Sequence, residues 1–87
     1  MLSIIIPARN EADNLEDILN YFENNLNNID YEVIIINDFS NDDTLIVGER
    51  LFKNYKNFKI FDNTIKGLGG AINLGISKSV GTKIAVM

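Results

Sequence analysis

Two uninterrupted runs of apolar residues constrain the fold of this chain more than any other feature. Residues 4–6 and 33–36 are all Ile or Val, and each run has the length of a strand. They lack the alternation of a half-exposed strand, so they are typical of strands buried on both faces of a parallel sheet. Because Pro7 has no backbone N–H to donate, we expect the first strand to stop there.

Segments with helical spacing of apolar residues separate the strand-like runs. The expected strands cover residues 2–6, 31–36, 58–61 and 83–87, and the expected helices cover residues 10–26, 42–55 and 71–79. The resulting order, βαβαβαβ, predicts the α/β class: a three-layer α/β/α sandwich around a mainly parallel sheet. A chain of 87 residues holds one such domain at most.

Composition excludes several classes of function. Eight Lys and Arg residues stand against twelve Asp and Glu residues, which gives a net charge of −4 and argues against a nucleic-acid partner. The chain has no Cys and no His, so disulfides, thiol nucleophiles, Cys/His zinc sites and triads with a His base are excluded. It also lacks a signal peptide pattern and an apolar run of roughly 20 residues, and we expect a soluble, cytoplasmic protein.

Ligands of open α/β sheets bind beyond the carboxyl ends of the strands, where the strand order reverses. That rule points to the loops after the first and second strands. In the first loop, Pro7 would hold the backbone close to a ligand ring and Arg9 would stack on the ligand or pair with it. Glu11 would accept a hydrogen bond from a ligand hydroxyl or orient Arg9. The alternative is a turn and helix cap with both charges in solvent.

In the second loop, Asp38 directly follows the buried strand. Its carboxylate could accept hydrogen bonds from a base imide or a ribose hydroxyl, or it could close an Asx-turn. We interpret Asp42, Asp43 and Thr44 as capping residues of the following helix. Asp42 and Asp43 are not a predicted metal site, because no nearby residue completes a coordination shell.

A glycine-rich segment follows the third expected strand. Gly67, Gly69 and Gly70 resemble a dinucleotide fingerprint, but Ile72 occupies the place of its third glycine, and that fingerprint belongs after the first strand. We expect these glycines to allow a tight turn and close packing of the following helix. Lys66 beside them could meet a phosphate or remain a solvated loop lysine.

Three segments together resemble the family-2 glycosyltransferases, and within them the dolichyl- or polyprenyl-phosphate sugar transferases. They are SIIIPARNE (residues 3–11), EVIIINDFSNDDT (32–44) and KGLGGAINLG (66–75). Arg9 stands where that family often has Tyr, and Asn37 replaces the first Asp of an Asp-Asp pair. The resemblance implies the glycosyltransferase A fold and sugar transfer from a UDP- or GDP-linked donor, with a polyprenyl phosphate as a possible acceptor.

Carried over residue by residue, the resemblance implies a nucleotide-sugar site, to which Ile36 would contribute backbone groups. The expected site residues are Pro7, Arg9, Glu11, Ile36, Asp38 and Lys66. Residues 84–87 match the strand that in the family precedes an Asp-X-Asp motif for Mg²⁺ or Mn²⁺. We therefore expect residues 1–87 to be the nucleotide-binding half of a glycosyltransferase, without metal ligands or catalytic residues of its own.

Two other interpretations remain open for function: a non-catalytic nucleotide-binding module and an inert, truncated remnant. A flavodoxin-like or Rossmann-like domain for another ligand is a third. An exposed sheet edge or face also predicts self-association into a homo-oligomer. In the full-length enzyme, the resemblance adds a location at the cytoplasmic membrane surface.

Overall fold

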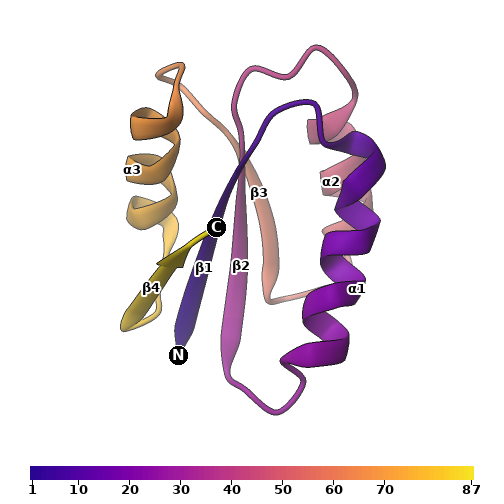
Figure 1. The fold of residues 1–87 in the computed structure, drawn as a ribbon, viewed down its shortest axis with the longest axis vertical. Helices are drawn as coiled ribbons and strands as arrows, with labels where there is room; N and C mark the ends of the chain where they lie inside the picture. Colours follow the sequence, from indigo (N-terminus) through magenta and orange to yellow (C-terminus); the bar gives the residue numbers. More distant parts are fainter.

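A computed structural model describes the whole chain, residues 1–87, as a sheet of four parallel strands between two helical layers (Figure 1). The strands are β1 (Leu2–Ala8), β2 (Tyr31–Asn37), β3 (Phe58–Asp62) and β4 (Lys83–Val86). The helices are the short 3₁₀ turn η1 (Ala12–Asn14) and the α-helices α1 (Leu15–Asn25), α2 (Thr44–Phe52) and α3 (Leu68–Lys78). None of the helices combines the length and the apolar composition needed to cross a bilayer.

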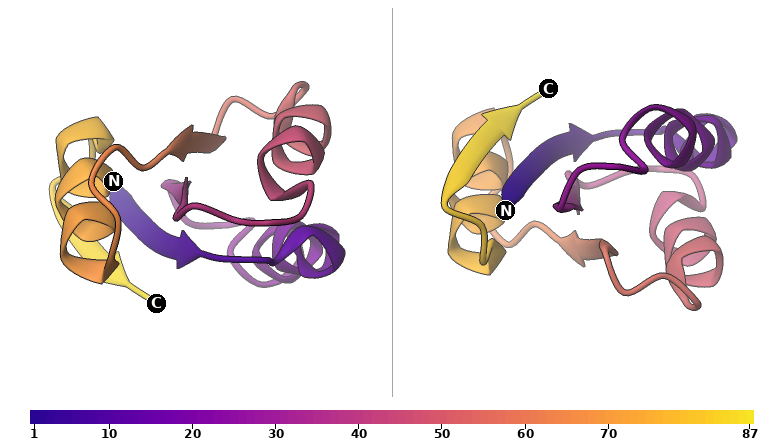
Figure 2. Two further views of the ribbon diagram at one scale, coloured as in Figure 1. Left: turned by 90° about the horizontal axis from the view of Figure 1, so that it is seen from above. Right: turned by 90° about the horizontal axis from the view of Figure 1, so that it is seen from below.

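The sheet has the strand order β3-β2-β1-β4, and every neighbouring pair is parallel. The first two crossovers run in one direction along the sheet and place α1 and α2 on one face (Figure 2). The third crossover runs back past β2 and β1, so the same handedness places α3 on the opposite face. The predicted three-layer α/β/α sandwich and its element order are confirmed.

The core consists of two apolar layers, one on each face of the sheet. Ile4, Val33 and Ile35 pack with α1 and α2, whereas Ile5 and the alternate residues of β2 pack with α3. All seven residues of β2 are buried. This burial on both faces is the physical reason for its uninterrupted apolar run.

The first strand continues beyond the predicted stop at Pro7. Pro7 pairs with Ile36, and the strand ends at Ala8. The Ala8 carbonyl accepts from Asp38 of the β2 side, whereas the Ile5 carbonyl accepts from Met87 of the β4 side. Because backbone groups alternate in direction along a strand, the nitrogen of Pro7 faces the β4 side, where pairing extends only to Ile5. The missing N–H therefore removes no hydrogen bond to β2.

Helix boundaries also differ from the prediction. The first helix, expected from residue 10, begins as the 3₁₀ turn η1 at Ala12 and becomes α-helical at Leu15. The second helix ends at Phe52 instead of about 55, and α3 begins at Leu68 instead of 71. Gly67, with φ of 114°, is the residue at which the chain turns into α3, so Gly69 and Gly70 already belong to the helix. Ile76 is 43% exposed, because α3 contacts the sheet mainly through Ala71 and Gly75.

The two edge strands of the sheet are β3 and β4. Ile84, Val86 and Met87 at the β4 edge are all more than 40% exposed. An unpaired edge with apolar side chains favours pairing with another chain. Self-association through this edge stays a prediction.

Candidate functional site

The carboxyl ends of β1, β2 and β3 bring three loops to one edge of the sheet, at the top of Figure 1. These loops follow Ala8, Asn37 and Asp62. The first two are the loops that the sequence analysis selected. The third contains Lys66 and leads into α3.

Polar side chains join the first loop to the second. The backbone N–H of Asn10 donates to Ser40 Oγ at 2.9 Å, and that of Asn41 donates to Asn10 Oδ1 at 2.7 Å. Asn10 has a φ of 57°, a left-handed conformation that Asn tolerates better than most residues. The Asp38 N–H also donates to the Ala8 carbonyl, at 2.8 Å. The two loops therefore form one connected surface.

Thr44 and Asp42 extend this connection to the start of α2. The fully buried Thr44 hydroxyl accepts from the Glu11 N–H at 3.0 Å and donates to Asp42 Oδ1. Asp42 also accepts from the Thr44 N–H at 3.0 Å and from the Ala12 N–H at 3.3 Å. These hydrogen bonds, led by that from the Thr44 hydroxyl, lower the pKa of Asp42. Asp42 is therefore a capping residue, as predicted, whereas Asp43 at the N-cap position makes no side-chain capping bond.

Asp38 joins the second loop to the third. Its Oδ1 accepts hydrogen bonds from Asn63 Nδ2 at 2.9 Å and from the Gly67 N–H at 3.1 Å. These two bonds lower the pKa of the Asp38 carboxyl, and the nearby charges of Arg9 and Lys66 lower it further. Asp38 is thus ionised at neutral pH and lies within the electrostatic influence of one cation from each flanking loop.

The structure brings part of the expected site together. Arg9, Asp38 and Lys66 converge at this edge, and Pro7 immediately precedes the residue that accepts the Asp38 N–H. Glu11 is adjacent, but its carboxylate accepts from Asn14 Nδ2 at 2.7 Å, which matches the alternative of a local helix-start contact. The side chain of Ile36 is fully buried in the α3-side core, so only its backbone could serve a ligand.

Contrary to the prediction, the loop after β2 does not border the point where the strand order reverses. The strand order places the reversal between β1 and β4, so the loop after β1 borders it and the loop after β2 lies one strand away. Asp38 reaches the neighbourhood of Arg9 because β1 and β2 are paired in register up to Ala8 and Asn37. The second loop therefore joins the site through strand pairing.

Asn37 occupies the position at which the family pattern has Asp, and the structure gives a reason for the amide. Asn37 Nδ2 donates to Asp62 Oδ1 at 2.8 Å, and its Oδ1 accepts from Ser40 Oγ. A carboxylate at residue 37 could not donate to Asp62 and would face a like charge. The amide nitrogen of Asn37 therefore joins the ends of β2 and β3, and its oxygen holds the loop that follows β2.

The acidic residues of this chain do not fit a metal site. No group of three or more His, Cys, Asp or Glu side chains lies close enough together to hold an ion. Asp38 Oδ1 and both carboxylate oxygens of Asp42 already accept hydrogen bonds from protein donors. A divalent cation at this edge would need ligands from other residues.

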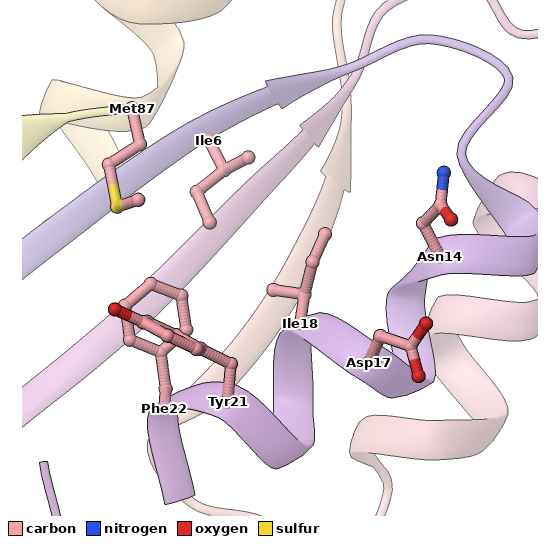
Figure 3. A pocket seen from close by; sticks show the side chains of 7 residues that line it. All are labelled: Ile6, Asn14, Asp17, Ile18, Tyr21, Phe22 and Met87. Carbon is pink, nitrogen blue, oxygen red and sulfur yellow. The ribbon is translucent and has the colours of Figure 1, made fainter. Parts of the chain in front are cut away.

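Two surface grooves lie elsewhere, and neither is lined by Arg9, Asp38 or Lys66. The larger, of about 390 Å³, lies between α1 and the β1–β4 part of the sheet. Figure 3 shows Met87 and Ile6 on its sheet side, across from Ile18, Tyr21 and Phe22 of α1. The other groove follows β3 and α2. Both are mainly apolar, unlike the loop surface.

Sequence reasoning missed Asn63, which is 7% exposed and bonded to Asp38. It also missed Asn10 and Ser40 as residues that join loops, although both lie within the segments that carry the family resemblance. A polar residue that directly follows a strand at the carboxyl edge was the available signal for Asn63. The same criterion had selected Asp38.

The profile of glycosyl transferase family 2 matches residues 3–87. The chain is 33% identical over 86 residues to a dolichol-phosphate mannosyltransferase of Pyrococcus furiosus, covering 99% of this chain and 24% of the relative. It is 33% identical over 93 residues to a dolichyl-phosphate beta-glucosyltransferase of Mus musculus, covering 95% and 29%. The chain thus spans about a quarter of the length of these curated relatives.

Solved structures share the fold. S. aureus TarS 1–349 superposes with a TM-score of 0.81 at 24% identity, covering 99% of this chain and 26% of that one. Mannosyltransferase PcManGT from Pyrobaculum calidifontis, in complex with GDP-Man and Mn²⁺, superposes with a TM-score of 0.75 at 22% identity, covering 95% and 25%. At these identities the likeness concerns the fold alone, and it confirms the glycosyltransferase A fold that the sequence resemblance implied.

Proposed function

The chain belongs to glycosyl transferase family 2, and from that premise we propose that its carboxyl-edge loops bind the nucleotide of a nucleotide-diphosphate sugar. In the proposed reaction this sugar is transferred from the nucleotide to an acceptor. The role of residues 1–87 is to recognise and orient the donor. The proposed site residues are those named from the sequence: Pro7, Arg9, Glu11, Ile36, Asp38 and Lys66.

The meeting of three loops around Asp38 carries this proposal: the Asp38 N–H donates to the carbonyl just before Arg9, and the Asp38 carboxylate accepts from the N–H just after Lys66. A nucleoside diphosphate combines an anionic diphosphate with neutral donors on its ribose and base. Arg9 and Lys66 suit the diphosphate, since each brings a cationic side chain with several hydrogen-bond donors. Asp38 suits the neutral donors, because its Oδ1 is held by the protein while its Oδ2 has no protein donor and can accept from the ligand.

The other proposed residues act differently. Pro7 stiffens the end of β1 next to this surface. Ile36 contributes through its backbone, since its side chain is buried. Glu11 would contact a ligand hydroxyl only by giving up its present bond to Asn14. We therefore assign the main binding contribution to Arg9, Asp38 and Lys66.

The named ligands of similar proteins support a UDP- or GDP-linked donor. One TarS structure contains UDP-GlcNAc, and the PcManGT structure contains GDP-Man and Mn²⁺. The names of the curated relatives refer to dolichol phosphate, which supports a polyprenyl phosphate acceptor and action at a membrane surface. A divalent cation would offset the charge of the leaving diphosphate. Its ligands would come from outside the acidic residues of this chain.

Isothermal titration with UDP and with GDP tests the proposal. We expect the chain to bind at least one of them, and Asp38→Ala to weaken binding about tenfold, as expected for loss of a hydrogen bond to a charged group. Asp30→Ala is the matched control, because Asp30 is an exposed carboxylate at the opposite edge of the sheet. It removes the same charge and should leave the affinity unchanged.

The alternatives have separate outcomes. Absence of binding to either nucleotide at millimolar concentration would contradict the proposal and favour an inert remnant. Binding by the chain without sugar transfer is what we expect, since no metal-binding cluster is present. Nucleotide binding without sugar transfer is also what the alternative of a non-catalytic nucleotide-binding module predicts. Assaying donor turnover with and without added Mn²⁺ completes the comparison.

A further inference from the structure

We propose that Asn63 is a positioning residue of the donor site, which holds the loop of residues 63–67 against Asp38 and so presents Lys66 to the diphosphate. The inference rests on the proposed function. It assigns a role to a residue that follows β3 and lies outside the segments that carry the family resemblance.

Asn63 is tied to three parts of the carboxyl edge. Its backbone N–H donates to the Asn37 carbonyl at 2.9 Å, which anchors it to the end of β2. Its Nδ2 donates to Asp38 Oδ1 at 2.9 Å and to the Ile65 carbonyl at 2.6 Å. Its Oδ1 accepts from the Ile65 N–H at 3.4 Å. At 7% exposure, this side chain is a buried connection between β2, β3 and the loop.

These contacts fix the backbone on both sides of Lys66. Before it, both polar backbone groups of Ile65 are bonded to Asn63. After it, the Gly67 N–H donates to Asp38, and the Gly67 carbonyl accepts from Ala71 at 3.0 Å and more distantly from Asn63 at 3.3 Å. Lys66 itself is exposed. The loop therefore holds its backbone in place while its ammonium group stays available.

Only an amide side chain of this length performs this combination. It donates two N–H groups, to a carboxylate and to a carbonyl, and accepts from a third group with its oxygen. Asp has the same shape but no donor when ionised, and Ala retains neither function. Because a loop that is ordered before binding avoids an entropic cost on association, Asn63 should affect nucleotide affinity without touching the nucleotide.

Titration of Asn63→Ala with UDP and GDP tests this role. We expect binding to weaken about tenfold, the effect of removing a hydrogen bond to a charged partner. Asn73→Ala is the matched control, since Asn73 is an exposed residue of α3. The control should bind within twofold of the unsubstituted chain. Equal affinity of Asn63→Ala and the control would overturn the inference.

Coupling to Lys66 separates positioning from general stability. If Asn63 acts through Lys66, then Asn63→Ala should weaken binding much less in a Lys66→Ala background than in the unsubstituted chain. Fully additive effects would overturn the inference. A loss of fold would lower affinity equally in both backgrounds, and circular dichroism of each variant detects it.

Asn63→Asp provides a second, independent readout. At pH 7 the new carboxylate faces Asp38, so affinity should fall below that of the unsubstituted chain. As the pH falls, two adjacent carboxyls can come to share a proton, and a protonated residue 63 can again donate to Asp38. Arg9, Lys66 and Asp62 are the other charged groups near this pair. We expect the affinity deficit of Asn63→Asp, relative to the unsubstituted chain, to shrink towards pH 5. An affinity deficit that does not change with pH would contradict the positioning role of Asn63. This readout remains usable if Asn63→Ala fails to fold.

The outcomes distinguish the two proposals. If the unsubstituted chain binds neither UDP nor GDP, the proposed function fails and the donor role of Asn63 fails with it. If the chain binds a nucleotide and the Asn63 variants bind it equally well, the proposed function stands and this inference alone fails.

Discussion

Replacement of Gly75 by Ala tests how α3 is held against the sheet. Gly75 is buried and faces Ile5, which is fully buried in β1 between β2 and β4. A Cβ at residue 75 would overlap Ile5 Cγ2 and lie 3.2 Å and 3.3 Å from its Cγ1 and Cδ1. Because Ile5 lies inside the sheet, neither it nor its strand can move away without disturbing the core.

The expected free energy follows from two opposing terms. Overpacking of a well-filled core costs about 1–3 kcal/mol. Replacing Gly by Ala within a helix recovers about 1 kcal/mol. With three close contacts to one rigid side chain, the upper half of the packing cost applies, so we expect a net loss of about 1–2 kcal/mol. For a domain of this size that lowers the melting temperature by roughly 4–16 °C.

Gly69→Ala is the matched control, because Gly69 lies in the same helix and a Cβ there would meet nothing within 4 Å. It should gain up to about 1 kcal/mol from helix propensity alone. Urea denaturation of the three chains, monitored by far-UV circular dichroism, measures the difference. A Gly75→Ala chain that is as stable as the unsubstituted one, or as stable as Gly69→Ala, would refute the close-packing argument.

Three further predictions concern ionisable groups. Hydrogen bonds and nearby cations lower the pKa of Asp38 in the folded chain. The ionised carboxylate therefore stabilises the fold above the unfolded pKa, and this stabilisation is lost as the pH falls through the folded pKa. The stability of Asp38→Asn, measured by acid denaturation, should depend less on pH. Burial and the bond to the neighbouring Glu23 carboxylate raise the pKa of Tyr31 to about 12, so its contribution to stability should be lost between pH 10 and pH 12. Tyr31→Phe should lack both that loss of stability and the tyrosinate absorbance change that accompanies it. Glu32, 3% exposed, accepts from the Ser3 hydroxyl at 2.6 Å and the Val80 N–H at 2.7 Å. Glu32→Ala should therefore cost about 2–4 kcal/mol in urea denaturation, and Glu32→Gln, which keeps an acceptor, clearly less.

Some residues of the segments that resemble the family bond to each other across the loops of the carboxyl edge. Asn10 and Ser40 lie in different segments of the resemblance, and the structure pairs them in one hydrogen bond. Thr44 closes the second segment and accepts from Glu11, at the end of the first. Several residues of these segments therefore have a structural role: they hold two loops together at the carboxyl edge of the sheet.

The sequence predicted the buried strands, their alternation with helices and the loops that follow them. These features depend on neighbours within a few positions, because burial on both faces leaves a continuous apolar run and a helix leaves its own period. It also predicted Asp38 and Arg9 as site candidates, since both follow strand ends. The prediction that the first strand ends at Pro7 was wrong. Whether the missing N–H of Pro7 costs a hydrogen bond depends on which strand its nitrogen faces, and the strand order decides that.

Only the tertiary structure decided how the loops combine. Asp38 bonds to residues 25 and 29 positions later in the chain, and the Glu11 N–H to a hydroxyl 33 positions later. Such partners are set by the strand order and register of the sheet, which local periodicity does not specify. The sequence therefore determined which polar residues stand at the carboxyl edge. The order of the strands determined which of these residues meet. It therefore placed Asn63 and Gly67 as donors to Asp38 Oδ1 and made Asn63 a buried connection between the loops.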